Sequence, residues 1–589
     1  MVKTEPGVGA VEKQRTDSSN STGLDVERMA GEQGDGLKRE LSPRDLNMIA
    51  FSGSVGTGLI IGTGKRMASE PLQRLSSGSS NFSKGGPGSL LVCFLLIGFV
   101  VWSVITALGE MAAMCPMKKG FAGYATRFVD PCLGFATGWN YFLKYVILLP
   151  TNLTASGMII QYWKPDLNVA IFVTIFGIGL VVLNLFHVST YGGAQYYLGW
   201  AKILIVIAMM CAGVATSCGG GPRHRTVGFR YWTDAFHDEY NGFHGSLGRF
   251  LAWWFVLVST CFAYTGAEIV GASFGEVREP RRNIPKAIKL TAIRILLIYI
   301  LAVFVITISV DPSSPLLLKT AGENGKGMKG ISPFVVAVKE AGIRFLPDIF
   351  NAGLLVFVIS AANADIYTAS RTLYGLSRDS QAPRIFGRTN LKGVPWQAVI
   401  VSSLFIVLGY MNAAKSAAQV FKYFVDVSTV LGVLNWMNIL LAYFGFVRAM
   451  RTQGFERKYM PYRCFCQPYS GMFALFVSIL VILFSGYECF VGGFDSTEFV
   501  THYIGVFAYL FFIAFWKITK RTKMVDPMEA SLSPSDEEGT GQGLPPAEWV
   551  TPLDLTSNTT GSQRLTGIDL KENSERGNLE ESVEGRMRR

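Results

Sequence analysis

The chain of 589 residues is poor in charge, because Asp, Glu, Lys and Arg make up 16% of it, whereas soluble globular proteins average about 25%. Histidine is rarer, with 5 residues, and the 9 cysteines lie mostly in apolar stretches. These shortages exclude an ordinary soluble enzyme and a disulfide-stapled secreted domain. No nucleophile–base or metal-ligand spacing occurs in the polar stretches, so we expect no enzyme activity, no metal and no cofactor.

Apolar residues, by contrast, are plentiful and gathered into runs. They make up 49% of the chain, and many runs approach the twenty residues needed to cross a ~30 Å hydrocarbon core. The sequence therefore predicts an all-α integral membrane protein. Its twelve predicted spans are 47–64, 89–112, 133–162, 168–187, 198–217, 248–272, 287–310, 344–369, 395–413, 421–446, 471–491 and 501–518.

Positive charge is concentrated in this membrane domain. Residues 45–519 hold 38 basic and 22 acidic residues, whereas residues 1–44 hold 7 and 8, and residues 520–589 hold 9 and 13. The loops after even-numbered spans are basic, so the positive-inside rule predicts that these loops and both termini face the cytoplasm. The charge therefore sets topology, and we expect no nucleic-acid partner. The polar tails, 1–44 and 519–589, are predicted to be disordered and to flank a transmembrane domain of residues 45–518.

Glycines interrupt two spans that lie five apart, as an inverted repeat requires. Span one reads Phe51-Ser-Gly-Ser-Val-Gly-Thr-Gly-Leu59, and span six reads Cys261-Phe-Ala-Tyr-Thr-Gly-Ala-Glu268. A helix broken in span one would point unpaired amides at a carboxylate, and one broken in span six would offer carbonyl groups to an ammonium. Together these groups fit the backbone of an amino acid. A small-residue packing stripe is the alternative reading of the span-one glycines.

Ionisable residues inside spans are costly and mark functional positions. Six occur: Glu110, Lys144, Lys202, Glu268, Asp365 and Asp426. Lys202 is predicted to take the place of a coupling cation beside span one, and Glu268 or Glu110 to change protonation during transport. Three alternatives stay open. Lys202 snorkels to an interface, Lys144 ties spans three and ten through Asp426, and Glu268 is a structural tie. Asp365, near Arg371, is predicted to mark a cytoplasmic helix end.

Several stretches jointly resemble the fungal amino-acid permeases of the amino acid–polyamine–organocation superfamily. They are Met48–Leu59, Gly109–Met111, Phe128–Pro131, Gly138–Tyr141, Gly266–Glu268, Pro280–Ile288, Ser370–Tyr374, Gly393–Pro395 and Met460–Arg463. The resemblance implies a LeuT-like 5+5 inverted repeat plus two C-terminal helices. The first repeat would cover residues 47–217, the second 248–446, and the last two helices 471–518.

The stretches around Lys144 and Asn152 are most similar to the dicarboxylic amino-acid permeases, which implies glutamate and aspartate as substrates. Many members of the family carry Glu at the position of Asn152, and a positive Lys144 would further favour an acidic side chain. The predicted substrate-binding residues are Ser54, Gly56, Thr57, Gly58, Lys144, Asn152, Phe262, Ala263, Tyr264, Gly266 and Ser428. The predicted coupling residues are Lys202, Glu268 and Glu110.

The resemblance implies a multi-pass plasma-membrane protein that imports amino acids by proton symport. Its expected partners are the amino-acid substrate, protons, the lipid bilayer and, on the cytosolic tails, ubiquitin and trafficking machinery. A neutral or broad-range permease and a nutrient-sensing transceptor are the alternatives. Residues 70–82 are an apparent insertion into the family pattern, and Asn81-Phe82-Ser83 fits a glycosylation sequon.

Overall fold

The computed structural model describes residues 58, 81–115, 117, 120–186, 188–224, 226–240, 242–269, 280–312, 314, 332–390, 393–413, 417–491 and 493–532. These residues form helices and connecting turns, and no sheet occurs among them. Eight of the helices are long and apolar enough to cross a membrane. They are α4 (Asn81–Met114), α6 (Pro131–Ile160), α8 (Val188–Ser217), α9 (Gly245–Tyr264), α14 (Leu346–Arg378), α16 (Ala417–Thr452), α17 (Tyr469–Phe484), whose apolar span continues to Phe490, and α18 (Ser496–Lys520).

The remaining helices are shorter or less apolar. Three apolar segments occur in α7 (Val169–Leu185), in the second half of α11 (Pro280–Ser309), and in α15 (Trp396–Leu404) with η6 (Phe405–Ala413). Short helices in the connections are α5 (Gly120–Phe128), η2 (Arg230–Asp234), α13 (Pro333–Glu340), η5 (Arg384–Gly387), η7 (Arg457–Tyr459) and η8 (Tyr487–Phe490). Eleven of the twelve predicted spans overlap these helices, and of span one only Gly58 is described. The number twelve and the inverted repeat stay predictions.

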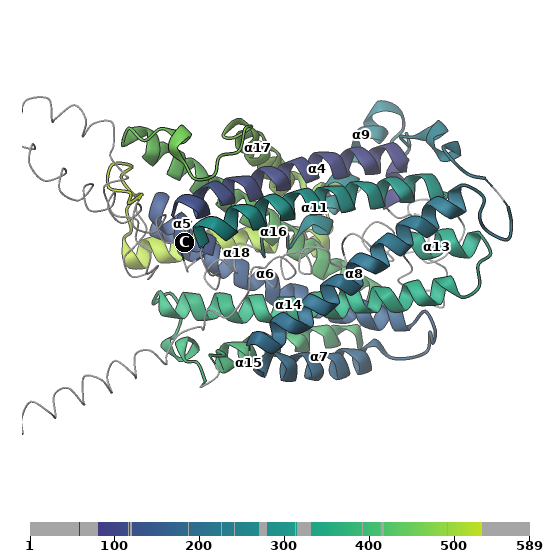
Figure 1. Ribbon diagram of the computed structural model, residues 1–589, viewed down its shortest axis with the longest axis horizontal. Helices are drawn as coiled ribbons and strands as arrows, with labels where there is room; N and C mark the ends of the chain where they lie inside the picture. Colours follow the sequence, from purple (N-terminus) through teal and green to yellow (C-terminus); the bar gives the residue numbers. More distant parts are fainter. Residues whose placement is uncertain are drawn as a thin grey trace, which may run out of the picture.

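The long helices run roughly along one axis, so the bundle has two ends (Figure 1). α4, α14, α16 and α18 all finish at one end, where α5 and η5 also lie. We call this end, which carries the Arg- and Lys-containing connections, the basic end. α9 begins and α13 lies at the opposite end. The basic loops that the sequence assigns to the cytoplasm thus lie together.

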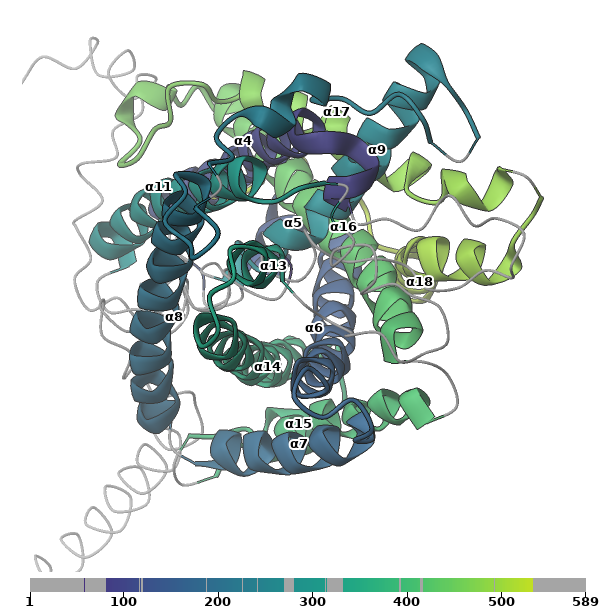
Figure 2. The ribbon, with the colours of Figure 1, turned by 90° about the vertical axis from the view of Figure 1, so that its right-hand side faces the viewer.

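Helices α6 and α14 form the centre of the bundle and pack closely along each other (Figure 2). The apolar stretches of α6, α14 and α16 are mostly buried, whereas those of α8 and α18 are mostly exposed. Exposed apolar side chains such as Phe507 and Phe511 are stable in contact with lipid tails, which are as apolar as leucine. Polar side chains therefore concentrate on the inner faces of α6 and α14.

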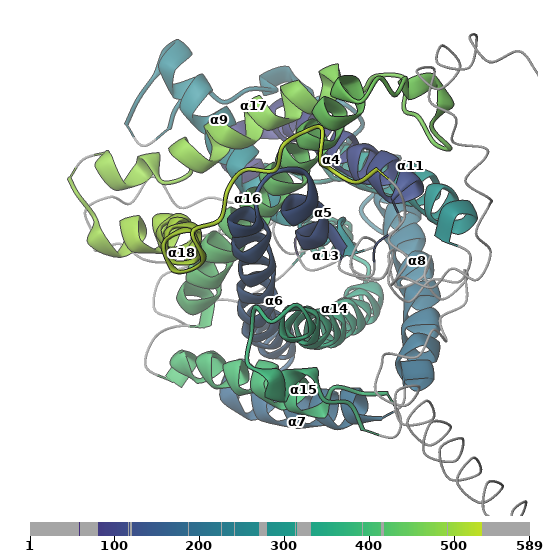
Figure 3. The same cartoon turned by 90° about the vertical axis from the view of Figure 1, so that its left-hand side faces the viewer.

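Residues 521–532 continue from α18 as an extended segment across the basic end (Figure 3). The side-chain amide of Gln453 donates to the carbonyl of Ala530 at 2.7 Å, and the Cys115 thiol donates to that of Leu532 at 3.1 Å. Ala530 is buried and Val525 packs on the core. The packed chain therefore extends beyond the predicted boundary at residue 518, because apolar residues recur after the basic end of α18.

Candidate functional site

Helix α9 is interrupted inside the bundle. It ends at Tyr264, Thr265 is extended, and a turn follows over residues 265–268. Gly266 has φ +101°, a conformation that glycine adopts without steric cost. Tyr264 is fixed by a hydrogen bond from its hydroxyl to the carbonyl of Phe94 and by stacking on Tyr299. The interruption thus sits on a rigid base, and the carbonyl of Phe262 there accepts hydrogen bonds from the backbone N–H and the hydroxyl of Thr265.

Gly58, from the first predicted span, touches this interruption. A Cβ atom at Gly58 would lie 2.5 Å from the Cα of Ala263 and 2.7 Å from the carbonyl oxygen of Phe262. Real Cβ atoms do not approach backbone so closely, so only glycine fits. The two glycine-containing segments predicted to hold the amino-acid backbone therefore meet at this point. The predicted site residues Ser54, Gly56 and Thr57 lie outside the described residues.

A buried ion pair follows the interruption. The Nζ of Lys144 on α6 donates to Oε1 of Glu268, and both side chains are almost fully shielded from solvent. The indole N–H of Trp436 on α16 donates to Oε2 of Glu268 at 3.3 Å. The Lys144 ammonium also lies 4.9 Å from the centre of the Tyr145 ring, a distance at which a cation is attracted to the ring face. Glu268 thus joins three elements of the bundle.

A second buried carboxyl group lies on α14. The side-chain amide of Asn152 donates to Oδ2 of Asp365 at 2.6 Å, and the positive charges of Lys144 and Lys202 both act on this carboxyl group. The prediction that Asp365 marks a helix end near Arg371 is therefore wrong. α14 continues to Arg378, which leaves Asp365 buried within the helix.

Lys202 lies near the middle of α8 and is fully buried, so the snorkelling alternative is also wrong. The predicted span began at residue 198, whereas α8 begins at Val188 and includes Gly192 and Gly193. The ammonium group of Lys202 lies 5.5 Å from the ring centre of Phe357 on α14. Its charge therefore belongs to the interior of the bundle.

Comparisons with known proteins identify the family of the chain. Residues 45–526 match the amino acid permease family. The chain belongs to this family. It is 42% identical to an uncharacterized amino-acid permease of Schizosaccharomyces pombe, over 88% of this chain and 96% of the relative. It is 39% identical to the dicarboxylic amino acid permease of Saccharomyces cerevisiae (84% and 79%) and 36% identical to a proline-specific permease of Emericella nidulans (88% and 92%).

The remaining predicted site residue of this permease, Ser428, is buried on α16. One turn further along α16, Gly432 faces the interruption, because a Cβ atom there would lie 2.7 Å from Thr265 and 3.6 Å from the Cε atom of Lys144. Trp436 follows after another turn. Residues spaced by four share a helix face, so Ser428, Gly432 and Trp436 form the α16 wall of the site.

Glu110 lies apart from this site, at the basic end of the permease. Both its oxygens accept hydrogen bonds from Arg457, at 2.6 and 2.8 Å, and it also accepts from the Tyr443 hydroxyl and the backbone N–H of Cys464. These contacts fasten the connection between α16 and α17 to the end of α4. We therefore leave Glu110 out of the proposed coupling path.

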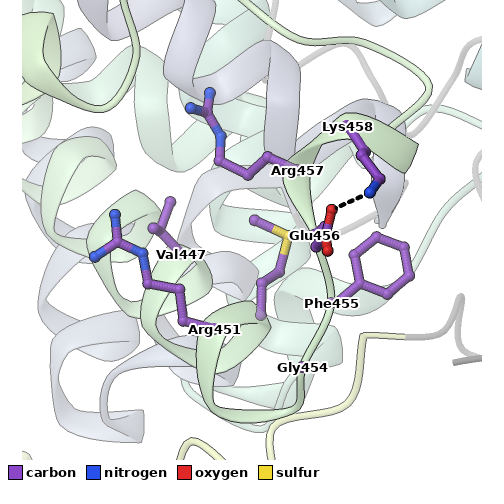
Figure 4. Close-up of a pocket in the computed structure, with 8 residues that line it drawn as sticks. Val447, Arg451, Gly454, Phe455, Glu456, Arg457 and Lys458 are labelled. Carbon is purple, nitrogen blue, oxygen red and sulfur yellow. Dashed lines mark ion pairs between the residues drawn. The ribbon is translucent and has the colours of Figure 1, made fainter. Parts of the chain in front are cut away.

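A hollow of about 380 Å³ adjoins this cluster (Figure 4). Its lining is Val447, Met450, Arg451, Gly454, Phe455, Glu456, Arg457 and Lys458. Lys458 pairs with Glu456 at 2.5 Å, while the Arg457 guanidinium points away from that pair. The hollow lies at the end of α16, on the connection to α17, and none of the predicted site residues lines it.

Asp426 does not pair with Lys144, so that alternative is wrong. Asp426 lies instead with Glu498 and His502 of α18, whose ligand-type atoms are within 4.8 Å of one another. Lys422 forms an ion pair with Glu498 in the same cluster and supplies its positive charge. The arrangement ties α16 to α18 through oppositely charged groups, which explains a carboxyl group in span ten without a role in transport.

Sequence reasoning missed two parts of the site. Trp436 is not among the predicted site residues, although its spacing of four and eight residues from Gly432 and Ser428 places it on the site face. Asp365 was misplaced because the span was ended too early. A longer helix, continued through Ser370 and Leu373 to Arg378, would have put Asp365 inside the membrane.

Proposed function

We propose that this permease imports acidic amino acids, glutamate and aspartate, across the plasma membrane together with protons. The observation that carries the proposal is the buried Lys144 beside the interruption of α9. The backbone segments at Gly58 and Phe262–Tyr264 would hold the ammonium and carboxylate common to all amino acids. Lys144 would then bind the side-chain carboxylate.

The absence of a charge on the Asn152 side chain supports the same substrate class. Asn152 is neutral and donates its amide to Asp365, so this position adds no further negative charge. The 39% identity to a dicarboxylic amino acid permease supports it independently. Lys202, buried beside α14, would supply a fixed positive charge where other transporters bind a coupling cation.

One observation favours a neutral substrate instead. Lys144 is already paired with Glu268, so its charge is compensated before substrate arrives. A proline-specific permease is also among the relatives, at 36% identity. The two candidates differ in whether the substrate brings an additional carboxylate to Lys144.

The test is uptake of radiolabelled glutamate, aspartate, proline and arginine by permease-deficient cells that express this chain. We expect glutamate and aspartate to accumulate, uptake to rise as external pH falls, and a protonophore to abolish it. Preferred uptake of proline would establish the neutral candidate. Sodium-dependent uptake that survives the protonophore would contradict proton coupling, and surface expression without uptake of any substrate would favour a sensor.

A further inference from the structure

The ion pair between Lys144 and Glu268 lies where the proposed substrate must bind. Both side chains are buried and contact each other directly. A substrate carboxylate that binds Lys144 competes with Glu268 for the charge of the same ammonium group. This raises the question of what neutralises Glu268 once the lysine has changed partners.

The balance of buried charges in the site indicates that a proton neutralises Glu268. Within the described site the buried ionisable groups are Lys144, Lys202, Glu268 and Asp365, which in their ordinary ionised forms are two positive and two negative. A neutral amino acid leaves this balance unchanged. An acidic one adds a negative charge, and an uncompensated charge in a buried site is strongly unfavourable. One proton restores neutrality.

We propose that an acidic substrate exchanges with Glu268 on Lys144, and that the displaced Glu268 carboxylate takes up one proton for each acidic amino acid carried. This inference rests on the proposed function and deepens it. It assigns to the Lys144–Glu268 pair both the recognition of the side-chain carboxylate and the uptake of the accompanying proton.

The surroundings of Glu268 identify it as the group that takes the proton. Facing it are Lys144, Tyr141 and Tyr145 from α6 and Trp436 from α16, with Asp365 of α14 acting on the same two tyrosines. Lys144 is the cation hydrogen-bonded to Glu268 among these described neighbours. Removing Lys144 therefore leaves Glu268 without a compensating charge.

Asp365 is the competing candidate for the same proton, because it is buried as Glu268 is, but it differs from Glu268 in its donors. Asn152 donates to it at 2.6 Å, and it is influenced by Lys202 as well as Lys144. It therefore keeps a donor and a positive charge when substrate engages Lys144. Trp436, in turn, donates to Oε2 of Glu268, which leaves Oε1, the oxygen released by Lys144, as the atom to be protonated.

The experiment compares glutamate with glutamine, which has nearly the same shape but no side-chain charge. Purified full-length protein in liposomes is assayed for uptake, proton flux and current. We expect glutamate to carry one more proton than glutamine, and the two to move the same net charge per molecule, since the additional proton cancels the additional carboxylate.

Two variants test the assignment. With Glu268→Gln, Lys144 has no competing carboxylate, so the additional proton should disappear and the apparent affinity for glutamate should lose its dependence on pH. With Lys144→Met, glutamate uptake should fall roughly tenfold or more, and glutamine uptake by a smaller factor. The double variant Lys144→Met/Glu268→Gln contains neither charge and controls for misfolding. Glu456→Gln removes an exposed carboxylate at the basic end as a matched control.

The outcomes separate the exchange from the proposed function. If the wild-type protein imports glutamate with protons but Glu268→Gln keeps the pH dependence, or if glutamate and glutamine carry equal numbers of protons, the exchange is wrong and the proposed function stands. If the wild-type protein imports neither glutamate nor aspartate, both are wrong.

Discussion

Two buried carboxyl groups of this permease, Glu110 and Glu268, have contrasting surroundings. Glu110 accepts two hydrogen bonds from Arg457, one from Tyr443 and one from a backbone N–H. Glu268 is bound by the Lys144 ammonium and, at 3.3 Å, by the Trp436 indole. Glu110 thus accepts four hydrogen bonds, two of them from Nη2 of Arg457, whereas Glu268 accepts two.

This difference separates structure from function. The partners of Glu110 come from α16 and the α16–α17 connection, so breaking them releases a part of the fold. The partners of Glu268 surround the interruption of α9, where, in the proposed exchange, a substrate carboxylate replaces the carboxylate of the protein. Both carboxyl groups are buried, so burial does not distinguish a structural contact from a site at which a substrate can exchange. The number and kind of hydrogen-bond donors distinguish them.

The largest effect is expected at Glu110. Glu110→Gln keeps the shape of the side chain but leaves the Arg457 guanidinium without its counter-charge. Removing one partner of a buried pair costs about 3 kcal/mol or more of the free energy of unfolding. We expect a lower melting temperature in detergent and little protein at the cell surface. Glu456→Gln, which removes the exposed partner of Lys458, should cost less than about 1 kcal/mol. Equal stability of these two variants would contradict the structural role of Glu110.

Loss of uptake without loss of folding is expected at Gly58. Gly58→Ala places a methyl group against the backbone of Phe262 and Ala263, which cannot yield as a flexible side chain does. Gly58 and the interruption of α9 would be pushed apart, and transport should stop while the protein still reaches the surface. Gly375→Ala on α14 is the matched control, because nothing lies within 4 Å of the added Cβ atom. Normal uptake by Gly58→Ala would remove the backbone site from this account.

The helices and the interruption of α9 could be predicted from the sequence, whereas the pairing of the buried charged groups could not. Hydropathy located eleven of the twelve ranges on helices, because membrane burial of backbone requires long apolar segments. The interruption at Gly266 was also visible, since glycine, polar residues and a carboxylate occur together within a span. The partners of the buried charged side chains were not visible in the sequence. Which of Glu268 and Asp426 binds Lys144 depends on how α6, α9 and α16 pack, and periodicity within one segment contains no such information.

A selective effect is expected at Asn152. Asn152→Glu places a second carboxyl group against Asp365, at a position where the present amide lies 2.6 Å away. The substitution removes the amide donor of Asp365 and adds negative charge whenever both carboxyl groups are ionised, so the site becomes less favourable for a negative substrate. Glutamate uptake should fall several times more than glutamine uptake. Asn152→Gln retains the amide and is the control, and a proportional loss of both substrates in Asn152→Glu would contradict the role in selectivity.

The smallest effect is expected at Asp130, which caps α6 at the basic end. Burial acts to raise the pKa of this carboxyl group, but hydrogen bonds from Lys517, the backbone N–H of Cys132 and Thr522 outweigh it, so the pKa lies below its ordinary value. A lowered pKa in the folded state means that the stabilisation is complete above about pH 3.9, the ordinary value for Asp, and is lost as the pH falls through the folded value.

Asp130→Asn should therefore lower stability by about 1 kcal/mol or less at neutral pH, because the Lys517 side chain is 42% exposed and its charge is screened by solvent. The measurement is the melting temperature of the purified variant and wild-type proteins over a range of pH. The difference between them should be constant from neutral pH down to mildly acidic pH and should shrink below about pH 3.9. A difference that instead grows under acidic conditions would mean that the ionised Asp130 carboxylate does not hold α18 to the start of α6.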